Sequence, residues 1–166
     1  MPGIGRTSAS FVATNCRNSF SNLKLALVAG ICGGVPFYNS RKTEIVLGDV
    51  IISEGLIAYD YGRQYPDRFV RKNSAPDVFG RPPPELRGLL GKLKGRFGQK
   101  RLRERTVTHL QTLKKEFGNE DGSSFGPAVH FGYIACGDQV MKSGQHRDVI
   151  SGEEGVIAFE MEGAGP

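Results

Sequence analysis

The clearest hydrophobic pattern lies in the last forty residues of the chain. Two short apolar runs, Val129 to Ile134 and Val156 to Phe159, each lead directly into a polar cluster, and a polar stretch of helical length separates them. This pattern is typical of a βαβ unit with two parallel strands. Because ligands bind beyond the carboxyl ends of such strands, we expect Asp138, Glu160 and Glu162 to line a small-molecule site.

Apolar residues elsewhere predict another helix and more strands. In Arg6 to Asn18 they recur every three or four positions, which indicates a helix. Leu23 to Ala29 is almost continuously apolar, as is typical of a strand buried on both faces of a parallel sheet. We expect Glu44 to Ser53 to form a bent strand or a pair of strands, with Leu56 to Tyr61 pairing as another. The predicted class is α/β, a mixed, mostly parallel sheet with helices on both faces.

Two helical stripes follow an irregular connection between Asn73 and Pro84. Gly95 and Gly98 are expected to break the two helices apart, since glycine costs about 1 kcal/mol relative to alanine inside a helix. A glycine and serine cluster from Gly118 to Gly126 predicts a loop. The stripes consist of Leu86, Leu89, Leu90, Leu93 and Phe97, and of Leu102, Thr106, Leu110, Leu113 and Phe117.

The positive charge of the chain is concentrated in this helical segment. Between Arg81 and Glu116 there are 11 basic and 3 acidic residues, a local net charge of +8, whereas the whole chain carries +5. Such a surface could contact nucleic acid through phosphates. Its two aromatic residues, Phe97 and Phe117, fall on the apolar stripes, so no stacking platform for bases is expected. We therefore favour a solvated helical face and treat residues 81–126 as a basic helical insertion and loop within a single domain spanning residues 1–166.

Composition excludes several other classes of protein. No apolar run is long enough to cross a bilayer and the first residues do not form a signal peptide, so we expect a soluble, cytoplasmic protein without membrane contact. Cys16, Cys32 and Cys136 are isolated, which favours reduced thiols packed in a core. His130 lies within a predicted strand and is expected to be a packed histidine. No spacing indicates a metal site.

Three motifs resemble a known family. The sequences Gly137-Asp-Gln-Val-Met-Lys-Ser-Gly and Gly155-Val-Ile-Ala-Phe-Glu-Met-Glu-Gly-Ala are similar to those of the nucleoside phosphorylase and nucleosidase superfamily, most closely its fungal branch. Val28-Ala-Gly-Ile-Cys-Gly-Gly resembles the strand and glycine turn that contact base and ribose in that family. The resemblance implies a nucleoside phosphorylase-like fold that cleaves the N-glycosidic bond of purine nucleosides without a cofactor.

The resemblance also implies a set of substrate-binding residues. Glu162 would accept hydrogen bonds from the ribose hydroxyls, and Met161 would flank the sugar. Cys32 and Gly33 would lie near the base and the ribose. Val140 and Met141 would form part of the base pocket.

Simpler roles remain open for the carboxylates of these motifs. Glu160 and Glu162 fit an acidic first turn of a helix, which the helix dipole favours. Asp60 could touch a ligand, but a surface ion pair with Arg63 is the preferred interpretation.

The chain departs from the family at both ends. The family's general acid is an aspartate beyond the Glu-Met-Glu motif, and this sequence ends at Pro166; the family's first strands would precede Met1. We therefore expect an incomplete, impaired domain with its catalytic acid unassigned. Phosphorylases place arginine and serine where this chain has Val28 and Ile31. Because apolar groups cannot neutralise phosphate, hydrolysis is favoured, with phosphate left open as a co-substrate.

Two kinds of function follow from these patterns. The first is a nucleoside-cleaving domain, and the second is a non-catalytic module that senses nucleosides or mediates an interaction. Missing edge strands are expected to leave apolar surface exposed, which favours self-association, so a homo-oligomer is also left open.

Overall fold

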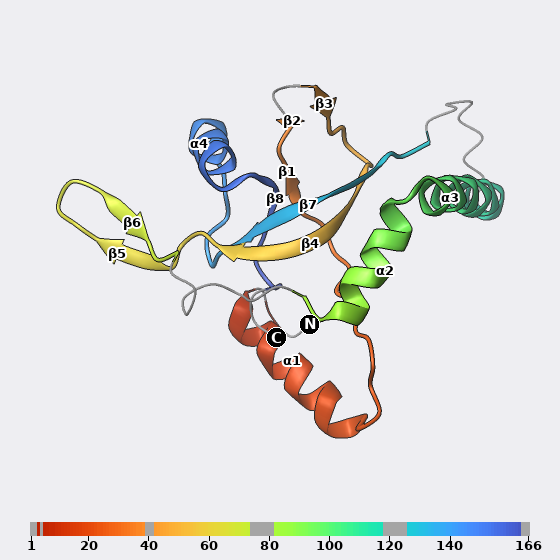
Figure 1. Cartoon of the computed structure of the whole chain (residues 1–166), viewed down its shortest axis with the longest axis horizontal. Coiled ribbons are helices and arrows are strands. Elements are labelled where there is room, and N and C mark those ends of the chain that lie inside the picture. The colour runs from red at the N-terminus through yellow and green to blue at the C-terminus, as the bar shows by residue number, and fades with distance from the viewer. Residues whose placement is uncertain (1–2, 4, 39–41, 74–81, 118–125, 164–166) are drawn as a thin grey trace.

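The structure is a computed structural model that describes residues 3, 5–38, 42–73, 82–117 and 126–163. Most of the predicted connection before Pro84, and the predicted loop from Gly118 up to residue 125, lie outside the described residues. Figure 1 shows a twisted sheet with helices arranged around it.

A βαβ unit forms the centre of the fold. Strands β7 (Val129–Cys136) and β8 (Val156–Glu160) run parallel, and helix α4 (Gly144–Glu154) connects them. Ser143 begins α4, because its side chain accepts a hydrogen bond from the backbone N–H of the third helical residue. Gly155 ends the helix in the left-handed region, with φ of 67°, where a side chain would be strained. The predicted βαβ unit is confirmed.

Two more strands complete a four-stranded sheet in the order β1-β8-β7-β4. Strand β4 (Val50–Ala58) is parallel to β7, and β1 (Gly33–Gly34) is antiparallel to β8. The α/β class with a mixed, mostly parallel sheet is confirmed. The expected pairing of Leu56 to Tyr61 with the preceding strand is wrong, because β4 continues through Leu56 after a bulge between Ser53 and Gly55.

Helices and two small hairpins surround this sheet. Helix α1 (Arg6–Ser19) confirms the predicted first helix and lies on the opposite side of the sheet from α4 (Figure 1). One hairpin joins β5 (Gly62–Gln64) to β6 (Phe69–Arg71), and an ion pair between Arg71 and Glu154 links its base to the end of α4. The other joins β2 (Phe37–Tyr38) to β3 (Thr43–Glu44). Within the described residues, no helix is long and apolar enough to cross a membrane.

The core lies between the sheet and α4. A cluster of buried side chains comes from the strands, from residues just after strand ends and from Ile150 of α4. Tyr59 and Phe159 pack edge to face, with ring centroids 5.6 Å apart. Cys136 is buried, whereas Cys16 is exposed, so the prediction of a core position holds for the first and is wrong for the second. The other members of the cluster are Val35, Ala135 and Val156.

The predicted strand at Leu23 to Ala29 is absent. This segment is irregular, and Leu27 and Val28 are 83% and 64% exposed. A strand of a parallel sheet needs a neighbour on which to form its hydrogen bonds. No described strand pairs with this segment, and its apolar side chains therefore face solvent. The described residues therefore expose apolar surface, as expected, while its expected cause, missing edge strands, stays a prediction.

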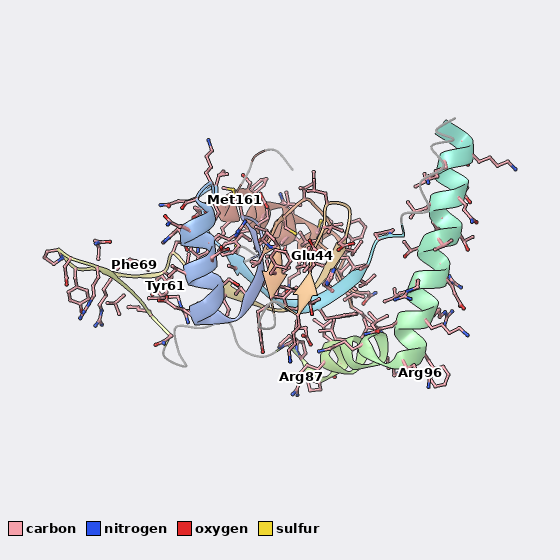
Figure 2. The ribbon with its side chains drawn as sticks, turned by 90° about the horizontal axis from the view of Figure 1, so that it is seen from above. Glu44, Tyr61, Phe69, Arg87, Arg96 and Met161 are labelled. Atoms are coloured by element: carbon pink, nitrogen blue, oxygen red, sulfur yellow. The ribbon has the colours of Figure 1, made fainter. Side chains whose placement is uncertain are left out.

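The two basic helices are α2 (Pro84–Lys94) and α3 (Arg96–Phe117). The predicted break at Gly95 is confirmed, because its backbone is extended and its N–H closes the last turn of α2 on the Gly91 carbonyl. The predicted break at Gly98 is wrong, since this residue lies in the first turn of α3. A β-carbon there would stand 2.1 Å from the Lys92 carbonyl oxygen, so glycine permits the close crossing of the helices. Figure 2 shows α3 at one end of the molecule and the β5–β6 hairpin at the other.

A buried polar network joins β4 and β7 at their amino ends. His130 is 6% exposed, and its Nε2 lies 2.9 Å from Asp49 Oδ2 while its Nδ1 lies 3.1 Å from the Tyr38 hydroxyl. Asp49 also accepts hydrogen bonds from the backbone N–H groups of Val46 and Ala128. The packed-histidine prediction is confirmed. Burial alone would raise the pKa of Asp49, but these hydrogen bonds outweigh it and lower the pKa.

The lowered pKa of Asp49 predicts a specific acid sensitivity. A carboxyl group whose pKa is lower in the folded state stabilises the fold above its unfolded pKa, and this contribution disappears as pH falls through the folded pKa. At neutral pH we expect Asp49→Asn to lower the free energy of unfolding by about 1–3 kcal/mol, because the network is left incompletely paired. The difference between wild type and variant should shrink below about pH 4.

Urea denaturation at successive pH values measures both free energies. Asp67→Asn, which alters an exposed carboxylate, serves as the control and should behave like wild type. A wild-type advantage over Asp49→Asn that stays constant through the acid range would contradict the prediction.

Candidate functional site

Three parallel strands end at one edge of the sheet. The last residues of β4, β7 and β8 stand in register, because Ala58 pairs with Cys136 and Cys136 pairs with Glu160. Backbone hydrogen bonds of 3.2 Å, from Tyr59 to Cys136 and from Gly137 to Glu160, extend the alignment past the strand ends. Polar side chains that follow the three strands are therefore brought to the same edge. They are Asp60, Asp138 and Glu162.

Arg6 binds the carboxylates that follow β4 and β7. Its Nη2 lies 2.7 Å from Asp60 Oδ2 and 2.8 Å from Asp138 Oδ2, and its Nε donates to the same Asp138 oxygen at 3.0 Å. The Asp138 backbone N–H donates to Asp60 Oδ2 at 2.9 Å. The preferred pairing of Asp60 with Arg63 is therefore wrong. A surface cation three residues away offers a weaker partner than a guanidinium that binds two carboxylates at once.

Glu162 is held by the turn that precedes α1. Its Oε1 accepts a hydrogen bond of 3.2 Å from the backbone N–H of Gly5, a buried residue with φ of 99°. A non-glycine residue would be strained in that conformation. The carboxylate is half-buried at the sheet edge. Its role as a ribose-binding group, which the family resemblance implies, stays a prediction.

Glu160 has a different role from Glu162. Its Oε2 accepts hydrogen bonds from the backbone N–H groups of Glu162, at 2.8 Å, and Gly163, at 2.6 Å. This is the pattern of a side chain that caps a turn. The alternative weighed for both glutamates, the first turn of a helix, does not apply to residues 161–163, which form a bend and a turn. Capping also fixes the backbone from which the Glu162 side chain extends.

Two carboxylate oxygens at this edge lack a protein partner. Among the described residues, Asp60 Oδ1 and Glu160 Oε1 are buried and accept no hydrogen bond. Buried acceptors are normally satisfied, by a protein group, by water or by a ligand. Both carboxyl groups therefore retain capacity for a donor such as a hydroxyl group.

The remaining predicted site residues divide into two groups. Gly33 pairs with Phe159, which places Cys32 and Gly33 beside the end of β8 together with Met161 (labelled in Figure 2). Val140 and Met141 follow the end of β7, where Val140 is 66% exposed and Met141 packs against the buried core cluster. The structure thus brings Cys32, Gly33, Met161 and Glu162 together around β8. Met141 lies against the core cluster instead.

Charge and burial set the protonation states at the edge. Hydrogen bonds from Arg6 lower the pKa of Asp138, so this solvent-exposed carboxyl group is ionised at neutral pH. Burial raises the pKa of the Cys32 thiol, and the negative charge of Glu160 raises it further. Cys32 is therefore a neutral thiol and not a nucleophilic thiolate. In the described part of the chain no three His, Cys, Asp or Glu side chains are grouped to hold a metal ion.

Arg6 is the residue that sequence reasoning missed. It lies far from its partners in the chain, 54 residues from Asp60 and 132 from Asp138, so no local spacing reveals the ion pairs. The available signal was an arginine at the start of a helix, directly after a glycine-rich turn, opposite two predicted strand ends that carry aspartates.

The fold is an open α/β sheet with carboxylates gathered at its carboxyl edge, the place where sheets of this type carry their ligand sites. Residues 1–165 match the model of the family described as the phosphorylase superfamily. The chain belongs to the phosphorylase superfamily, as the motifs around Asp138 and Glu162 predicted.

Relatives identified by sequence include both long and short proteins. A nucleotide-binding leucine-rich repeat (NLR)-like protein of Hyaloscypha variabilis is 30% identical over 99% of this chain, which corresponds to 20% of that protein. The 5'-methylthioadenosine/S-adenosylhomocysteine nucleosidase of Mycobacterium bovis is 24% identical over 97% of this chain and 58% of its own length. The chain therefore spans only part of the relatives that it matches.

Solved structures show the same fold. A nucleosidase of Helicobacter pylori with 5'-methylthioadenosine in its active site has a TM-score of 0.59 at 18% identity, covering 98% of this chain and 55% of that one. The native futalosine hydrolase of the same organism has a TM-score of 0.60 at 18% identity, with the same coverage. At this level of identity the agreement concerns the fold.

The turn after β7 has no room for a side chain. A β-carbon at Gly137 would stand 2.5 Å from the ring of Tyr59, which is buried, packs on Phe159 and donates its hydroxyl to the Gln139 carbonyl at 3.0 Å. We predict that Gly137→Ala lowers the free energy of unfolding by about 1–3 kcal/mol, because the ring is held on several sides.

Chemical denaturation followed by circular dichroism measures this loss. Gly152→Ala is the control, since a β-carbon there meets nothing within 4 Å in helix α4 and should be neutral or slightly stabilising. Equal stability of the two variants would contradict the close contact with Tyr59.

Proposed function

We propose that the chain binds a purine nucleoside at the carboxyl edge of its sheet and belongs to domains that hydrolyse the N-glycosidic bond. The observation that carries the proposal is the position of Glu162. Its carboxylate stands at the shared end of three parallel strands, within the motif that resembles the ribose-binding segment of the family. The nucleosidase names of its relatives support the same reaction class.

The chemistry of glycosidic cleavage explains the use of such a carboxylate. The ribosyl group becomes oxocarbenium-like as the bond to the base breaks, as in glycoside hydrolysis. A carboxylate that accepts hydrogen bonds from the ribose hydroxyls orients the sugar and stabilises its developing positive charge. Glu162 would fill this role, with Met161 and Cys32 flanking sugar and base beside β8.

Water is the better nucleophile at this edge. Asp138 is held ionised and Glu160 and Glu162 lie nearby, so a phosphate ion would approach several carboxylates while Arg6 is already paired. Val28 and Ile31, which replace the phosphate-binding residues of phosphorylases, are 64% and 100% exposed and supply no charge. Repulsion between like charges therefore favours hydrolysis over phosphorolysis.

Protonation of the leaving base is the difficult step for this chain. Asp138 is a poor proton donor because Arg6 keeps it ionised. We therefore expect the 166-residue chain to bind nucleosides more readily than it cleaves them.

A non-catalytic nucleoside sensor is the second candidate. In the Hyaloscypha variabilis relative the matching region is only 20% of a nucleotide-binding leucine-rich repeat-like protein. A domain of this kind thus also occurs as a small part of a much longer chain. Binding without base release would favour this candidate.

Glu162→Gln tests the proposed binding site. The substitution keeps the shape of the side chain but removes the negative charge that strengthens its hydrogen bonds with the ribose hydroxyls. Since hydrogen bonds to a charged group are worth about 1.5–3 kcal/mol, the dissociation constant for adenosine or inosine should rise by about 10- to 100-fold. Isothermal titration calorimetry measures the affinity, and chromatography with and without phosphate measures free base.

Glu153→Gln, on the exposed surface of α4, is the matched control and should bind as wild type does. Base release that requires phosphate would contradict hydrolysis. Folded wild-type protein that binds no purine nucleoside at millimolar concentration would overturn the proposed function.

A further inference from the structure

We infer that Arg6 is the positioning residue for Glu162: it anchors the start of α1 across two strand ends and thereby presents the Gly5 N–H that orients the Glu162 carboxylate. This inference rests on the proposed function, because it assigns Arg6 a part in nucleoside binding. Arg6 itself would not touch the nucleoside.

The geometry connects Arg6 to Glu162 in two steps. First, the Arg6 side chain binds Asp60 at 2.7 Å and Asp138 at 2.8 Å, and its backbone N–H donates to Asp138 Oδ1 at 3.3 Å. Second, the adjacent residue, Gly5, donates its N–H to Glu162 Oε1 at 3.2 Å. Only the two backbone torsions of Gly5 separate its N–H from the peptide bond that it shares with Arg6. Fixing Arg6 on the ends of β4 and β7 therefore holds the Gly5 N–H near the end of β8.

In the described part of the chain, apolar packing against α1 is sparse. Ala9 is the one buried residue of this helix, which extends from Arg6 to Ser19. Apolar contact therefore contributes little to its docking. The ion pair with Asp60 is partly shielded from solvent, with side-chain exposure of 26% for Arg6 and 17% for Asp60, whereas Asp138 is 55% exposed. Because one guanidinium meets two carboxylates through three charged contacts, the arrangement is stronger than a single surface pair.

An arginine is required by the shape of this arrangement. Asp60 and Asp138 present oxygens that the Nε and Nη2 groups meet in a fixed planar fork. A lysine would supply one charged nitrogen without that geometry. Arg6→Lys should therefore retain part of the anchoring and Arg6→Ala none.

Arg6 is expected to affect ligand binding only through the orientation of the Glu162 carboxylate. Without the Gly5 N–H, Glu162 loses the hydrogen bond that selects its orientation, and the ribose must bind a carboxylate that samples several rotamers. Removal of Arg6 should thus weaken nucleoside binding only as long as Glu162 is present.

The experiment is a double-mutant cycle on the full 166-residue chain. Adenosine affinity is measured by calorimetry for wild type, Arg6→Ala, Glu162→Gln and the combined variant. We expect Arg6→Ala to raise the dissociation constant by about tenfold and to have little further effect when Glu162 is already Gln. Arg6→Lys should be intermediate. Lys100→Ala, which removes a 73% exposed cation from α3, should leave binding unchanged.

A merely structural role gives a different pattern. If Arg6 only stabilises the fold, the losses from Arg6→Ala and Glu162→Gln should add, and the inference is then overturned. Equal affinities of wild type and Arg6→Ala overturn it as well. Should Arg6→Ala fail to fold, Arg6→Lys and Asp138→Asn take its place in the same cycle, since each weakens the anchoring.

A ligand-free measurement separates this inference from the proposed function. Amide hydrogen exchange at Gly5, followed by nuclear magnetic resonance, should accelerate in Arg6→Ala relative to Lys100→Ala. Unchanged protection of Gly5 contradicts the anchoring by Arg6. Faster exchange at Gly5 in Arg6→Ala would support the anchoring even if wild type bound no nucleoside. Absent binding by wild type would contradict the proposed function, and with it the role of Arg6 in ligand binding.

Discussion

The parallel register of β4, β7 and β8 is the constraint on which the rest of this structure depends. It places the ends of three strands side by side, although the polar residues that follow them lie far apart in the sequence. A carboxyl-rich edge results from the simplest property of a parallel sheet, in which all strands finish on the same side. The core under α4 supports this register because Ile150 packs against β7 and β8 residues from one side.

The same alignment creates an electrostatic problem that Arg6 resolves. Asp60, Asp138, Glu160 and Glu162 gather at one edge, and their negative charges repel one another. Arg6 pairs with two of them through its single positive charge, and backbone N–H groups stabilise the other two. The first helix is consequently attached to the sheet mainly by polar contacts. Stability and the arrangement of the candidate site therefore depend on the same few interactions.

The parts of the fold that are local in sequence could be predicted, and those that depend on distant partners could not. The βαβ unit and α1 follow from periodicity, because each element carries its own apolar pattern. Leu23 to Ala29 has the composition of a buried strand but no neighbour in the described chain, so its pattern was misleading. The partner of Asp60 is 54 residues away and could not be read from spacing. Glu162 was identified only through a family motif, because two glutamates in the first turn of a helix would look the same in the sequence.

One irregularity in β4 determines whether the edge exists at all. Val50 faces Val129 across the ladder, an offset of 79 residues, but beyond the bulge Ala58 faces Cys136, an offset of 78. Glu54 is the extra residue, and its side chain pairs with Lys94 of α2. At the amino end Asp49 binds the Ala128 N–H, and at the carboxyl end Asp60 binds the Asp138 N–H, so each offset is fixed by its own hydrogen bond. Deleting one residue at the bulge would impose a single pairing offset on the whole strand, although its two ends require different offsets. The chain could satisfy the buried histidine network or the Arg6 anchor, but not both.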